Sequence, residues 1–360
     1  MSQYGHTHAV TKKGGRKFLW LRIFLSVVLI LFLLYTIDLG EIADIVSRCN
    51  FTYVLLAYFI ALCDRVLMAY KWNILLKAKG IRIPLINITG TYLISTFLGL
   101  FLPATIGGDA LRAYAVSKEG HSATNVISSI IIERALGFIA LFIFVLISIV
   151  LSIFVFGQNF FEGIWKLFWL FLVLLVLSIF LIYFSFSESA LNRLGFLFRW
   201  FERIHKYRIV QKLKEVYISY RSFQDDRTTL SIFLLLSLVE NLFPLLWTYS
   251  LSLAFNIEVP LLYFFILIPI VLVLVRLPIS FDGIGIQEGA FVYFLALIGV
   301  AKSEGLLLGI SSHIIAVMSV LPGAVLYCVS GVNFRIPRYE GEGELSQISA
   351  DLKKDVLSEK

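Results

Sequence analysis

Two short stretches of the sequence combine residue types that can hold a polar ligand inside an apolar chain. The first, FLPATIGGDALRAY at residues 101–114, joins a glycine pair to Asp109 and Arg112. The second, LPISFDGIGIQEGAF at residues 277–291, places glycines before Glu288. Proline ends a helix, glycine lets a ligand approach the backbone, and the start of the next helix offers free N–H groups to an anion. Both stretches therefore predict a binding site for a phosphate or carboxylate. In the first, Arg112 could bind two phosphate oxygens.

The composition places these stretches in an integral membrane protein. Of the 360 residues, 59% are hydrophobic and 15% are charged, and the mean hydropathy is +0.88. A soluble domain could not bury that much apolar surface. The apolar runs are long and continuous, which predicts an all-α polytopic protein, because the strands of a barrel would alternate. The net charge of +7 then indicates cytoplasmic loops and anionic lipid headgroups, not nucleic acid.

We predict about eight spanning segments, together with two Pro/Gly-broken segments that enter the bilayer and turn back. The N-terminal run starts like a signal peptide, but it is too long and has no cleavage site, so it is interpreted as the first span. A further run at residues 289–300 is only half a span in length. The runs long enough to cross a ~30 Å hydrocarbon core are residues 18–36, 51–70, 85–106, 126–156, 164–186, 230–255, 261–277 and 305–329.

Basic residues predict the orientation. Lys12, Lys13, Arg16 and Lys17 place the N-terminus in the cytoplasm, and Lys71, Lys77, Lys79 and Arg82 return the chain there after residues 51–70. If every later run crosses, the very basic connection at residues 187–229 lies outside. The rule is restored if residues 85–106 re-enter instead of crossing, and the C-terminus is then cytoplasmic as well. A complete crossing by this run remains the alternative.

These runs and loops divide the chain into five parts. They are a basic cytoplasmic tail (1–17), an N-terminal membrane half (18–186), a basic connection (187–229), a C-terminal membrane half (230–332) and a polar tail expected to be disordered (333–360). In the connection, apolar residues recur at helical spacing with arginines opposite, which predicts helices on the membrane surface. A solvated linker is the alternative.

Several charged residues fall within or beside the apolar runs. A charge at the bilayer centre costs about 2.5–3.5 kcal/mol, so each needs a partner or water. Glu240 has no basic neighbour in its own run, which makes it the best candidate for a carboxylate facing a cavity. Asp109 could cap the helix that follows, line a cavity, or do both. The remaining charges are Asp64, Arg65, Glu133, Arg134 and Arg276; Glu133 and Arg134 lie either inside the bilayer or at its interface.

The two broken segments, one in each half of the chain, are the pattern that indicates the central site of a transporter. Backbone without helical hydrogen bonds survives at membrane depth only where protein or water in a cavity satisfies it. We therefore expect the two segments to meet and enclose one polar chamber.

Three stretches, FLPATIGGDALRAY, IIERALGF and LPISFDGIGIQEGAFVYFLALIGV, resemble the motifs of the lysylphosphatidylglycerol synthase transmembrane-region family, also called UPF0104 or flippase-like proteins. The resemblance covers nearly the whole hydrophobic chain, but the usual Gly-Gly of the third motif is Asp282-Gly283 here. It implies movement of an aminoacylated phospholipid between leaflets; the soluble aminoacyl-transferase domain of the peptide-resistance factors is not part of this sequence. The matching residues are Pro103, Gly107, Gly108, Asp109, Arg112, Glu133, Arg134, Pro278, Ser280, Gly283, Gly285 and Glu288.

The leading hypothesis is a flippase-like translocator of a phospholipid or a polyprenyl-phosphate-linked lipid. The arginines and free N–H groups would hold the phosphate, and the carboxylates would pair with the arginines or meet a cationic headgroup. The alternatives are a membrane enzyme and an accessory subunit of envelope-lipid synthesis. An envelope-lipid synthase and, in a homo-oligomer, a second copy of the chain are possible partners. The sequence has no Walker motif, catalytic grouping or metal-ligand set, so no cofactor or metal is expected.

Overall fold

Every described element of the protein is a helix. The structure, a computed structural model, describes residues 24, 27–29, 31–33, 35, 39–102, 106–156, 163–187, 207–277 and 279–330. Within these ranges there is no β-strand, which confirms the predicted all-α class. The helices are α2 (Leu39–Ser47), α3 (Phe51–Ala78), α4 (Leu85–Gly99), α5 (Ile106–Lys118), α6 (Ala123–Phe156), α7 (Ile164–Phe186), α9 (Tyr207–Arg221), α10 (Arg227–Glu240), α11 (Leu242–Ala254), α12 (Leu261–Arg276), α13 (Ile286–Ala296), α14 (Lys302–Met318) and α15 (Leu321–Ser330), with a short 3-10 helix, η1 (Ser222–Asp225), before α10.

Five helical stretches are long and apolar enough to cross a membrane, which is the pattern of a multi-pass membrane protein. Two of them are nearly continuous pairs, α10 with α11 and α14 with α15. The predicted first span and the polar C-terminal tail lie mostly or wholly outside the described residues. The five stretches are Phe51–Ala78, Ala123–Val155, Trp165–Phe186, Arg227–Ala254 and Lys302–Val329.

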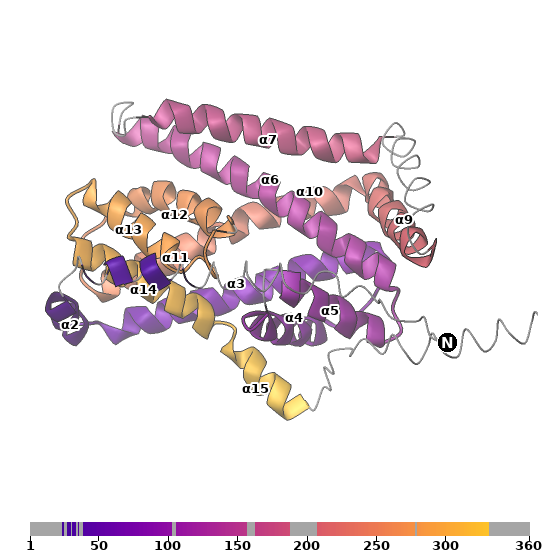
Figure 1. The fold of residues 1–360 in the computed structure, drawn as a ribbon, viewed down its shortest axis with the longest axis horizontal. Helices are drawn as coiled ribbons and strands as arrows, with labels where there is room; N and C mark the ends of the chain where they lie inside the picture. The colour runs from indigo at the N-terminus through magenta and orange to yellow at the C-terminus, as the bar shows by residue number, and fades with distance from the viewer. Residues whose placement is uncertain are drawn as a thin grey trace, which may run out of the picture.

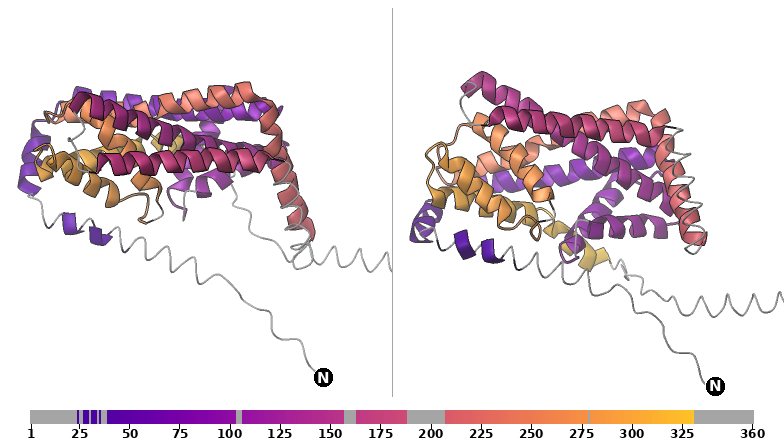
Figure 2. Two further views of the ribbon diagram at one scale, coloured as in Figure 1. Left: turned by 90° about the horizontal axis from the view of Figure 1, so that it is seen from above. Right: turned by 45° about the horizontal axis from the view of Figure 1, so that its top comes forward.

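Two pairs of shorter helices lie at opposite ends of the bundle. Helices α4 and α5 have 15 and 13 residues, and α12 and α13 have 16 and 11. At 1.5 Å per residue the longest of the four is about 24 Å long, which is less than a ~30 Å hydrocarbon core. In Figure 1 α4 and α5 lie in the right half and α12 and α13 in the left half, and Figure 2 agrees. Each pair thus has the length and placement of a hairpin that enters halfway.

Glycines let α4 and α5 approach closely. A Cβ atom added at Gly99 would lie 3.0 Å from the Cα of Gly108, and one added at Gly108 would lie 3.1 Å from the carbonyl oxygen of Ser95. A side chain at either position would push the two backbones apart. Gly99 and Gly108 therefore close the first hairpin by permitting backbone contact between its two helices.

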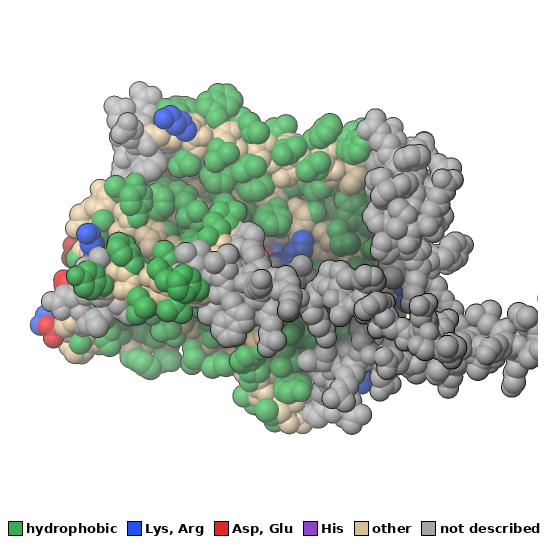
Figure 3. Space-filling view, viewed as in Figure 1, with side chains coloured by type: hydrophobic (Ala, Val, Ile, Leu, Met, Phe, Trp, Pro, Cys, Tyr) green, Lys and Arg blue, Asp and Glu red, His purple; other side chains and the backbone are tan. Residues whose placement is uncertain are grey.

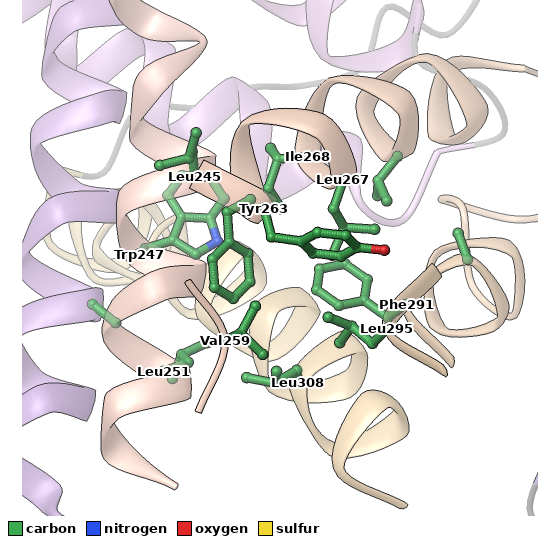
Figure 4. Packing of buried hydrophobic residues seen from close by; sticks show 14 of the residues in the cluster. Leu245, Trp247, Leu251, Val259, Tyr263, Leu267, Ile268, Phe291, Leu295 and Leu308 are labelled. Atoms are coloured by element: carbon green, nitrogen blue, oxygen red, sulfur yellow. The ribbon is translucent and has the colours of Figure 1, made fainter. Parts of the chain in front are cut away.

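The largest apolar core lies around the second hairpin. It includes Trp247 of α11, Tyr263 and Leu267 of α12, Phe291 of α13 and Leu308 of α14, whose side chains converge in Figure 4. This core packs α12 and α13 against the long helices α11 and α14. The second hairpin is therefore anchored by apolar contacts, while its tip carries the polar residues.

Helix α9 runs across one end of the bundle, where α7 ends (Figures 1 and 2). It is held there by side chains: the Tyr217 hydroxyl donates to the carbonyl of Ser185, and the Tyr220 ring stacks on Phe186 at 5.1 Å. Helix α7 is mostly exposed and apolar, as expected of a helix that faces lipid. A helix lying across the ends of spanning helices agrees with the surface helix expected in the basic connection; residues 188–206 of that connection lie outside the described residues.

Asp226 caps the start of α10. Its carboxylate accepts hydrogen bonds from the Thr229 hydroxyl at 2.7 Å and the Thr229 N–H at 3.0 Å, and these bonds hold its pKa below the ordinary 3.8. We expect Asp226→Ala to lower the free energy of unfolding by about 1 kcal/mol. Because the pKa is lower in the folded protein, the charged cap stabilises fully above pH 3.8 and is lost as the pH falls further. Unfolding of both forms in detergent at pH 7 measures the difference, and equal stability would contradict the cap.

Candidate functional site: a charge cluster at the first hairpin

Arg112 is the centre of a buried charge cluster between α3, α5 and α6. It is 2% exposed; its Nη2 donates to Asp109 at 2.8 Å, and its Nη1 lies 2.7 Å from a carboxylate oxygen of Glu133. Its guanidinium carbon is 4.8 Å from the ring centre of Trp72 and 5.2 Å from that of Tyr92. A buried cation with two carboxylates and two aromatic rings is well compensated. Arg112 therefore binds other protein groups, and its position does not support the predicted phosphate clamp.

Asp109 joins Arg112 to a second arginine. One carboxylate oxygen accepts from Arg112, and the other accepts from Nε of Arg134 at 2.9 Å and lies 2.8 Å from its Nη2. The interpretation of Asp109 as the N-cap is wrong, because α5 begins at Ile106 and Gly107 and Gly108 are already helical. Asp109 instead lies in the first turn, where the helix dipole favours a negative charge.

Arg134 and Arg276 are the accessible cations of the cluster. The Arg134 side chain is 53% exposed although it pairs with Asp109, and Arg276, the last residue of α12, is also exposed. The Arg276 guanidinium lies 5.5 Å from the ring centre of Phe138, and among the described residues it has no acidic partner. The two arginines are close enough for their charges to repel. An anion between them would relieve that repulsion.

Glu240, the predicted cavity-facing carboxylate, forms an ion pair with Lys71 of α3. The sequence interpretation ended this span at residue 70 and placed Lys71 in a cytoplasmic loop. That placement is wrong, because α3 continues to Ala78 and Lys71 is only 4% exposed. Lys71 also lies within electrostatic range of Glu133 and Arg276, so it links α10 to the cluster.

Asp64 and Arg65 lie on α3 about two helical turns before Lys71. Asp64 is 4% exposed and lies 3.9 Å from Nη1 of Arg65, and Nε of Arg65 donates to the Ser319 hydroxyl at 2.9 Å. Asp64 also interacts electrostatically with Lys71. The charges that the sequence placed within the apolar runs are thus partnered mainly by one another, which is how a membrane protein can bury them.

The second hairpin carries a separate polar group at its tip. Gly283 and Gly285 have φ angles of 77° and 85°, and Asp282 has φ 51°, so the chain turns through the left-handed region. One carboxylate oxygen of Glu288 accepts from the Gly285 N–H at 2.6 Å; the other lies 3.8 Å from Nδ1 of His313. Nε2 of His313 is 3.6 Å from Asp282. Glu288 therefore caps α13 and joins the tip to α14.

The two broken segments are brought together only in part. Arg276, just before the second turn, lies near Arg134 of α6, which pairs with Asp109 of the first hairpin, but no ion pair between described residues joins the Glu288 group to the Arg112 group. Ser280 is 1% exposed and lies in the second turn. Pro103 and Pro278 lie outside the described residues.

Helix lengths give the depth of the cluster. Arg112 precedes the end of α5 by about 9 Å, Lys71 precedes the end of α3 by about 10 Å, and Glu133 follows the start of α6 by about 15 Å. Residues 79–84 join α3 to α4, and residues 119–122 join α5 to α6. Because α4 and α5 form a hairpin, these helix ends lie on one side of the bundle. The cluster therefore lies about 9–15 Å from these helix ends, within the helical bundle. Figure 3 shows basic side chains near the middle of an otherwise largely apolar face.

Sequence reasoning missed Lys71, Trp72, Tyr92 and His313. Lys71 could have been found, because it follows Asp64 by two helical turns and Glu240 lacked a basic partner. The aromatic residues carry no such signal, since apolar runs contain many. His313 lies close to Asp282, the residue at which the third motif departs from Gly-Gly. The two residues are far apart in the sequence, so the sequence does not indicate this contact.

Chemically, the arrangement offers positive charge to an anion. No group of three His, Cys, Asp or Glu side chains that could hold a metal ion occurs in the part of the chain that was searched, the described residues. What the cluster offers is a pair of exposed guanidinium groups beside apolar helices. Such a pair fits a phosphate whose attached chains stay in lipid.

Comparisons with known proteins agree with this architecture. The family model described as the lysylphosphatidylglycerol synthase TM region matches residues 19–323. A UPF0104 membrane protein of Methanocaldococcus jannaschii is 26% identical over 259 residues, which is 66% of this chain and 73% of that protein. The residues matched by the family model include both hairpins and all residues of the charge cluster. The chain therefore belongs to the lysylphosphatidylglycerol synthase transmembrane-region family.

Proposed function

We propose that this protein moves a phosphate-bearing lipid, either a phospholipid or a polyprenyl-phosphate-linked lipid, between the leaflets of the cell membrane. One observation carries the proposal: Arg134 and Arg276 are both exposed and close enough for their charges to repel, and Arg276 has no acidic partner among the described residues. Two like charges this close are costly unless an anion or water meets them. A lipid phosphate supplies the anion.

In this proposal, the other charged residues hold the helices and side chains that line the path of the headgroup. Arg112, held by Asp109 and Glu133, fixes the first hairpin and orients Asp109 towards Arg134. The two short hairpins lie towards opposite ends of the bundle, an arrangement that suits a site reached from either side in turn. Both termini lie in the cytoplasm in this proposal, because basic residues dominate the N-terminal tail and the connection at residues 187–229.

Reconstitution in liposomes tests the proposal. Fluorescent phosphatidylglycerol or a labelled polyprenyl phosphate in the inner leaflet should reach the outer leaflet faster than in empty vesicles. Arg134→Gln and Arg276→Gln should each slow this movement about tenfold, because each removes one charge-assisted contact with the phosphate. Arg82→Gln, which removes an exposed arginine outside the cluster, should not.

Two outcomes would overturn the proposal. One is movement of both lipids no faster than in empty vesicles when circular dichroism shows a folded helical protein. The other is equal transport by the native protein and the Arg134→Gln, Arg276→Gln double variant. Formation of a chemically modified lipid would instead favour the enzyme alternative.

A further inference from the structure

A pocket of about 640 Å³ lies away from the charge cluster, between the end of α7, the end of α9 with η1, and the start of α10. We call it the α7–α10 pocket. Phe186 and Leu230 give it an apolar side, and Arg221 and Arg227 give it a basic side. None of these residues belongs to either hairpin, so the pocket is separate from the proposed transport route.

The basic side of the pocket is built for an anion. Nε of Arg221 donates to the Phe186 carbonyl at 2.8 Å, which fixes the guanidinium in the pocket wall. Arg227 is exposed, and neither arginine makes an ion pair with a described residue. Asp225 is the acid in the lining, so two cations face one carboxylate. The pocket therefore has a net positive charge, with donors that suit phosphate oxygens.

The apolar side of the pocket adjoins the exposed surface of α7. Tyr183 of α7 lines the pocket and is 76% exposed, on a helix whose outward side chains are almost all apolar. Helix α7 ends at Phe186, and α9 crosses the bundle there (Figure 2). Because spanning helices end near the headgroups, we expect the pocket to lie at that level. A basic pocket between helices at this level matches the charge of an anionic headgroup and lets acyl chains run along the apolar helix.

We propose that the α7–α10 pocket binds an anionic phospholipid of the surrounding leaflet, with its phosphate between Arg221 and Arg227 and its acyl chains along α7. Tyr217 and Tyr220 hydrogen-bond α9 to Ser185 at the end of α7. A lipid in the pocket would contact both helices and so add a second link between the basic connection and the N-terminal membrane half. The site does not depend on transport, because a resident lipid can stay in place while another moves past the first hairpin.

Photo-crosslinking in liposomes tests this site directly. The full chain is reconstituted with photoactivatable phosphatidylglycerol or photoactivatable phosphatidylcholine, and crosslinked peptides are identified by mass spectrometry. We expect phosphatidylglycerol to label residues 183–187 and 221–230 at least about fivefold more than phosphatidylcholine does. Arg227→Gln should reduce this labelling about tenfold, and Asp225→Asn should increase it, because the two changes alter the pocket charge in opposite directions.

Controls distinguish a lipid from a free anion and from a folding defect. Arg82→Gln, an exposed arginine outside the pocket, should label like the native protein. Inorganic phosphate at millimolar concentration should not compete, because it lacks the acyl chains. The proposal is overturned if phosphatidylcholine labels the pocket equally, if Arg227→Gln and Asp225→Asn leave labelling unchanged, or if phosphate displaces the lipid.

Discussion

Replacing Arg112 with leucine is expected to destabilise the folded protein by about 3–5 kcal/mol. Arg112 is 2% exposed and pairs with Glu133 at 2.7 Å, so its loss leaves that carboxylate without its ion-pair partner. The aromatic rings of Trp72 and Tyr92 also lose the group between them. Equilibrium unfolding in mixed detergent micelles measures the change.

Two companion variants separate charge from packing. Arg112→Lys keeps the charge but cannot reach Asp109 and Glu133 with a planar fork, so an intermediate loss is expected. Adding Glu133→Gln to Arg112→Leu removes the uncompensated charge and should recover part of the stability. If Arg112→Leu lowers the free energy of unfolding no more than the matched surface variant Arg82→Leu does, the cluster does not stabilise the first hairpin.

Gly323→Ala is expected to loosen the packing of α15 against α4. A Cβ atom at this position would lie 2.3 Å from the carbonyl oxygen of Leu93, a backbone atom that cannot move without shifting α4. Overpacking of this kind typically costs about 1–3 kcal/mol, and the shift would carry the first hairpin with it. A lower midpoint of thermal unfolding is the expected measurement.

Gly90 provides the matched control in the same interface. A Cβ atom at Gly90 would lie 4.0 Å from Cδ1 of Leu326, which is ordinary contact, so Gly90→Ala should be neutral or stabilise by up to about 1 kcal/mol through helix propensity. Opposite signs for these two alanine substitutions would establish the close approach of α15 and α4. Equal effects would contradict it.

The broken segments and the buried charges could be predicted from the sequence because each breaks a strong local rule. Proline and paired glycines do not belong in a spanning helix, and charges such as those of Asp64 or Glu240 need partners there. The positive-inside rule also predicted that residues 85–106 re-enter; α4 has 15 residues, a length that agrees with this, and the re-entry stays a prediction. Local composition was sufficient for these features.

The pairing of the charges could not be predicted, because it depends on tertiary packing. Glu240 and Lys71 are far apart in the sequence, and Lys71 looks like a loop residue until α3 is seen to continue to Ala78. Arg112 looked like a ligand clamp because nothing in its own segment shows that Glu133 and two rings enclose it. The accessible cations are therefore Arg134 and Arg276, a distinction that only burial provides.

Helix α6 has 34 residues and is thus about 51 Å long, well beyond the ~30 Å thickness of a hydrocarbon core. Such hydrophobic mismatch is met by tilting the helix or by thickening the bilayer around it. Glu133 and Arg134 lie on this helix, so the level at which they sit varies with the tilt. The acyl-chain length of the host membrane thereby becomes a variable that sets where the charge cluster lies.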